Sequence, residues 1–70
     1  MAITALVYLQ QPGTTEASYL GKIELEVHPV LNGRARFMHE GRVVIGNIDT
    51  LVPPDWAAKG VIPTIHVVQR

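Results

Sequence analysis

The sequence contains no cysteine among its 70 residues. That absence excludes disulfides, thiolate metal sites and a cysteine nucleophile, and it favours a reducing, cytoplasmic location. Charged residues make up only 17% of the chain, and six basic residues balance six acidic ones. Because proteins that bind nucleic acid usually carry a basic excess, this balance argues against that class. No apolar run approaches the roughly 18 residues of a membrane-spanning helix, so we expect a soluble protein without a membrane partner.

Apolar residues, in contrast, are abundant and make up 47% of the chain. Seventy residues supply one hydrophobic core, so we expect residues 1–70 to form a single small β-barrel domain. A domain of this size buries only about 60% of the surface of its unfolded chain, and such domains usually gain stability from disulfides, a metal or a partner subunit. The apolar surplus therefore favours a homo-oligomer.

Two segments near the N-terminus show the alternation of β-strands. Ile3–Gln10 places Ala5 and Val7 on one face and Leu6 and Tyr8 on the other, which predicts a strand buried on both sides or covered by a partner. Tyr19–Val27 alternates apolar and polar residues, which predicts a half-buried strand with four larger apolar residues inside: Tyr19, Ile23, Leu25 and Val27. Gly21 in this segment indicates a bend or a close backbone approach.

Two turn signals divide the middle of the chain. Asn32-Gly33 predicts a hairpin that joins the second strand to Arg34–Met38, with a β-bulge near Pro29 that keeps the register. His39-Glu40-Gly41 predicts a three-residue loop with Gly41 at positive φ, followed by a strand over Arg42–Ile48. In that register the inner face carries Ala35, Phe37, Val43 and Ile45, and the outer face carries Arg34, Arg36, Met38, Arg42 and Val44.

The C-terminal part adds a helical turn and one strand. Pro54, Asp55 and a terminal Gly60 around two alanines predict a short helical turn, and alternation around Ile65 and Val67 predicts the last strand. Five strands with a helical turn before the last predict an all-β fold, a small five-stranded SH3-like barrel.

Two short stretches resemble the SH3 family. Gly60-Val61-Ile62-Pro63, followed by Val67, resembles the Gly-x-Ile-Pro stretch that leads into the final strand of SH3 domains. Ala5-Leu6 resembles the start of their first motif. The resemblance implies the architecture alone, because the ligand-groove tyrosines and the acidic first loop of SH3 domains are missing.

Candidate contact residues lie where a lone barrel would expose apolar side chains to water. They are Leu6, Tyr8, Val44, Ile48 and Val68. Exposed apolar patches mark interaction sites. We therefore expect a non-enzymatic interaction module that binds a second copy of itself, with a different protein as the alternative partner.

Two other function classes remain open. Arg34, Arg36 and Arg42 fall on the outer face of one predicted hairpin, through which a small β-barrel could bind nucleic acid. Their simpler role is cross-strand pairing with Glu24 and Glu26. No nucleophile, phosphate-binding loop or characteristic metal-ligand spacing stands out, so no catalytic residue, metal or cofactor is assigned. An enzyme would need a site formed at a subunit interface, which is the third alternative.

Overall fold

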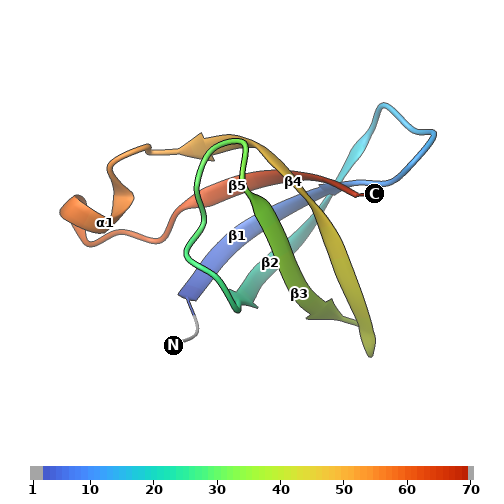
Figure 1. Ribbon diagram of the computed structural model, residues 1–70, viewed down its shortest axis with the longest axis horizontal. Helices are drawn as coiled ribbons and strands as arrows, with labels where there is room; N and C mark the ends of the chain where they lie inside the picture. Colours follow the sequence, from blue (N-terminus) through green and yellow to red (C-terminus); the bar gives the residue numbers. More distant parts are fainter. Residues whose placement is uncertain (1–2, 70) are drawn as a thin grey trace.

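The computed structural model describes residues 3–69 and is built from strands (Figure 1). The elements are β1 (Ile3–Gln10), β2 (Ala17–Leu25), β3 (Arg34–His39), β4 (Arg42–Val52), α1 (Trp56–Lys59) and β5 (Thr64–Gln69). Figure 1 shows α1 beyond the ends of β4 and β5, away from the strands. The expected all-β, five-stranded SH3-like architecture with one helical turn before the last strand is confirmed. Over the described residues, no helix is long and apolar enough to cross a membrane.

The five strands form one curled sheet that leaves the barrel half open. Their order is β2-β1-β5-β4-β3, with β1 parallel to β5 and every other pair antiparallel. β2 and β3 are therefore the two edges of the sheet. This arrangement curls around a core but leaves β2 and β3 without a second neighbour.

The predicted hairpin at Asn32-Gly33 is wrong, because β2 ends at Leu25 and does not pair with β3. The chain turns at this point, and the Gly33 N–H donates to the Val30 carbonyl at 2.9 Å. The Asn32 N–H then donates to the Ile48 carbonyl, and the Ile48 N–H donates to the Gly33 carbonyl, both at 2.8 Å. Asn32-Gly33 thus extends the pairing of β3 with β4, and no bulge near Pro29 is needed.

The turn between β3 and β4 has two residues instead of the three that were predicted. His39 pairs with Arg42, and Glu40 and Gly41 have φ values of 51° and 76°. Positive φ at both central residues is the signature of a type I′ hairpin turn. The predicted positive φ at Gly41 is confirmed. Because side chains alternate with a period of two, shortening the loop by one residue inverts the two faces of β4.

A β-bulge divides β2 and changes the face of its first half. Val7 pairs with Gly21 while Tyr8 pairs with Tyr19, so Leu20 is the extra residue. Gly21 has a φ of 86°, which glycine adopts without strain. Ile23 and Leu25 face inward as predicted. The predicted inward positions of Tyr19 and Val27 are wrong, because these residues are 56% and 59% exposed and Val27 lies beyond the end of β2. Leu20 packs against the core in place of Tyr19.

The inner face of the sheet holds the hydrophobic core. Its buried members come from all five strands and are Ala5, Val7, Leu9, Leu25, Ala35, Phe37, Val44, Ile48, Ile65 and Val67. Phe37 and Ile65 are at most 2% exposed. Because the inner face is already filled, apolar residues on the other face have no place in this core.

Candidate interaction surfaces

Apolar side chains occur on the outer face of the sheet at both ends of the strand order. Tyr8 on β1 pairs with Tyr19 on β2, and their ring centroids lie 4.9 Å apart. Met38 on β3 pairs with Val43 on β4, and Ile45 lies two residues further along β4. These five side chains are between 40% and 56% exposed. They are large apolar groups that the strands hold in contact with water.

β5 connects the two halves. Val68 pairs with Asn47 on β4 and with Gln10 on β1, so it is the diagonal neighbour of both Ile45 and Tyr8. Leu6 lies beside Tyr8 on the same face of β1. We call the resulting surface the outer apolar face, made of Leu6, Tyr8, Tyr19, Met38, Val43, Ile45 and Val68. It extends across all five strands.

Three of the predicted contact residues, Leu6, Tyr8 and Val68, lie on this outer apolar face. The outward placement of the other two is wrong, because Val44 and Ile48 are only 6% and 1% exposed and belong to the core. The two-residue turn is the physical reason, since it inverts β4. Val43 and Ile45, which were predicted inside, take the outward positions instead.

One hydrogen-bonded polar pair lies within the outer apolar face. The register between β4 and β5 shifts between Ile48 and Thr50, which leaves Asp49 as the extra residue. The Oδ1 atom of Asp49 lies 2.5 Å from the Nδ1 atom of His66. His66 is opposite Thr50 on one side and Tyr8 on the other. The face therefore combines apolar area with a few fixed polar groups, which is the composition of protein interfaces.

The three arginines of the predicted nucleic-acid surface do not share a face. Arg34 and Arg36 point outward from β3, alternating with the buried Ala35 and Phe37. Arg42 pairs with His39 and takes the inward parity of β4, so its predicted outward position is wrong. The Nε atom of Arg36 lies 3.6 Å from a carboxylate oxygen of Glu26. The predicted partners therefore meet, but across the opening between β2 and β3 and not within a ladder, because Glu26 follows the end of β2. Within the described part of the chain, Arg34 is then the outward arginine without an ion pair, and no continuous basic surface surrounds it.

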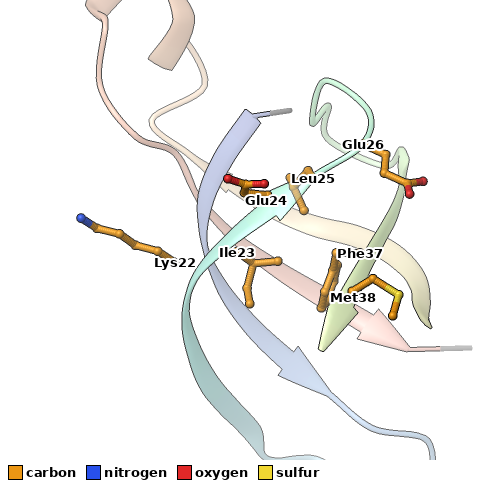
Figure 2. A pocket seen from close by; sticks show the side chains of 7 residues that line it. All are labelled: Lys22, Ile23, Glu24, Leu25, Glu26, Phe37 and Met38. Carbon is orange, nitrogen blue, oxygen red and sulfur yellow. The ribbon is translucent and has the colours of Figure 1, made fainter. Parts of the chain in front are cut away.

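A cleft of about 590 Å³ lies between the two edges of the sheet (Figure 2). Residues 22–26 line one side and Phe37 and Met38 line the other. In Figure 2, Ile23 and Phe37 point into the space between β2 and β3, whereas Lys22 extends away from it. The ion pair between Arg36 and Glu26 links the two sides. The cleft is where both strand edges meet solvent.

Sequence reasoning missed Tyr19, Val43 and Ile45 as outward residues. Gly21 was the available signal for Tyr19, because glycine inside a strand pattern marks a bulge that inverts the residues before it. For β4, a Glu-Gly dipeptide permits a two-residue turn, and that register would have turned Val43 and Ile45 outward. The pairing of Asp49 with His66 depends on a bulge for which the sequence carries no local signal.

Among residues 3–69, no group of three or more histidine, aspartate or glutamate side chains lies close enough to hold a metal ion. Comparisons with known proteins found no matching family model, no similar curated protein and no similar solved structure. A function can therefore be proposed only from the geometry of the chain itself.

Proposed function

We propose that the chain is a small, non-enzymatic interaction module that binds a second copy of itself through the outer apolar face. The observation that carries the proposal is the exposure of large apolar side chains on all of β1 to β4, on a sheet whose inner face already holds a complete core. These side chains expose on the order of 500 Å² of apolar surface, a size at which patches on monomers are often functional.

A second copy is the partner that the composition favours. The chain carries no net charge, so two copies do not repel each other at neutral pH. A stable interface buries about 800 Å² on each partner. The polar groups among the apolar ones, such as the Asp49–His66 pair, would supply the remainder of that area. Because a domain of this size is marginally stable alone, burial against a second copy would also raise its stability.

Substitutions to glutamate on the outer apolar face test the proposal. Tyr8→Glu on β1 and Ile45→Glu on β4 each place a negative charge on a different strand of the face. Ile45→Ala is a milder substitution, which removes apolar area without adding a charge. Leu31→Glu is the control, because Leu31 is 54% exposed but lies in the loop between β2 and β3. Sedimentation measures association, and far-UV circular dichroism verifies the fold.

We expect both glutamate variants to shift association to concentrations at least about tenfold higher, which corresponds to about 1.4 kcal/mol. Ile45→Ala should shift it in the same direction, and Leu31→Glu should associate like the unmodified chain. If folded Tyr8→Glu and Ile45→Glu associate as well as the control, the outer apolar face is not the contact surface.

A further inference from the structure

The free edge of β2 offers a second contact surface, which borders the outer apolar face where Lys22 pairs with Leu6. The segment Gly21–Leu25 pairs in regular register with β1 on one side. Its other side faces the cleft, because β2 ends the strand order (Figure 2). An edge strand presents unpaired N–H and C=O groups that can pair with a strand of another chain. The segment is about 17 Å long, enough for a short ladder.

We propose that this edge pairs with the same edge of a second copy, antiparallel and about a two-fold axis at Ile23. In that register Lys22 lies directly opposite Glu24 of the second copy, and Glu24 lies opposite its Lys22. The two Ile23 side chains meet at the axis. Opposite charges placed directly across two strands attract, and so do apolar pairs. Within residues 3–69, neither Lys22 nor Glu24 makes an ion pair, so both are available.

The charge pattern also selects this register over its neighbours. An axis at Lys22 would place two lysines opposite each other, and an axis at Glu24 would oppose two glutamates. An axis at Leu25 would oppose Glu24 to Glu26. Like charges directly opposite each other destabilise a strand pair. Only the axis at Ile23 pairs both charges of the segment with opposite charges.

The other free edge lacks this property. An axis at Ala35 of β3 would oppose Arg34 to Arg36, and an axis at Arg36 would oppose two arginines. Arg36 is in addition engaged with Glu26 of its own chain at 3.6 Å. Like charges therefore oppose each other in both of these registers of β3, whereas the register of β2 centred on Ile23 opposes none. Charged residues on an edge strand are one way in which natural proteins limit association.

The edge contact uses the backbone of β2 and the charges of Lys22 and Glu24, whereas the outer apolar face uses apolar side chains. The two surfaces adjoin where Lys22 lies opposite Leu6. A protein that used both two-fold contacts would form an assembly larger than a dimer, and loss of either contact would leave a dimer. The failure of one contact can therefore be told apart from the failure of the other.

Charge reversal at Lys22 and Glu24 tests the edge contact. Lys22→Glu opposes two pairs of glutamates in a homodimer, and Glu24→Lys opposes two pairs of lysines. Mixed together, however, the two variants would form a heterodimer in which every opposed pair has opposite charges. The double variant Lys22→Glu/Glu24→Lys regains a self-complementary edge. Glu16→Lys is the control, because it makes the same change in charge at an exposed site in the loop between β1 and β2.

At low salt we expect each single variant to weaken the edge contact at least about tenfold in sedimentation. An equimolar mixture of the two, and the double variant alone, should recover the mass of the unmodified protein. Glu16→Lys should leave the mass unchanged. If the single variants keep the mass of the unmodified protein, or if their mixture does not recover that mass, the edge contact is wrong. This result would hold even if Tyr8→Glu and Ile45→Glu had supported the outer apolar face.

Discussion

Ile45 and Ile48 are the same residue type on the same strand and face opposite sides of the sheet, so truncating each to alanine tests the register of β4. Ile48 is 1% exposed inside the core, and alanine there removes three buried carbon atoms and leaves a cavity. Losses of this kind cost about 2–5 kcal/mol. For a domain of this size, a loss of about 3 kcal/mol lowers the melting temperature by roughly 12–24 °C.

The same truncation at Ile45 removes atoms from a side chain that is already 41% exposed. No closed cavity forms there, so the free energy of unfolding of the monomer should fall by only about 1 kcal/mol or less. Urea and thermal unfolding, followed by circular dichroism at protein concentrations low enough to suppress association, measure both values. If Ile45→Ala costs as much stability as Ile48→Ala, the two-residue turn and the faces of β4 derived from it are wrong.

Three further substitutions test the turn and a close backbone approach, each by its urea midpoint. Glu40→Asn should raise the free energy of unfolding by about 0.5–1 kcal/mol, because asparagine tolerates the positive φ that glutamate adopts at 51°; a loss of stability would speak against the type I′ turn. Gly41→Ala should lower it by about 1–2 kcal/mol through left-handed strain at φ 76°, and a neutral result would contradict that conformation. Gly46→Ala should lower the free energy of unfolding by about 1–3 kcal/mol, because the new Cβ would lie 2.5 Å from the Val68 carbonyl oxygen. An unchanged midpoint would show that β4 and β5 are further apart at this point than the structure places them.

Alternation in the sequence was sufficient to predict the strands and much of the core. The inward positions of Ala5 and Val7 followed from the first strand, and those of Ala35 and Phe37 followed from the third. The short helix before the last strand was predicted from Pro54, Asp55 and Gly60, and it spans Trp56–Lys59. These features depend on local chemistry, namely the period of apolar residues and the preferences of proline and glycine.

The errors arose where a single residue of register decides which face a side chain takes. One residue fewer in the turn after His39 moved Val44 inward and Val43 outward. One extra residue in β2 moved Tyr19 outward. Turn length and bulges are set by how neighbouring strands pair, which a single sequence specifies weakly.

Local sequence signals also could not predict that β2 and β3 are left unpaired. Asn32-Gly33 carries a strong hairpin signal, yet its backbone bonds to Ile48 of β4 instead of closing a ladder with β2. That choice depends on contacts between residues far apart in the sequence.

The mass of the unmodified protein in solution tests the central claim of self-association most directly. The chain has a mass of 7.7 kDa. In sedimentation equilibrium at about 100 µM, we predict a mass at least twice that of the chain, together with a melting temperature that rises with protein concentration because dissociation is coupled to unfolding. A mass of 7.7 kDa at that concentration, with a melting temperature independent of concentration, would contradict the account.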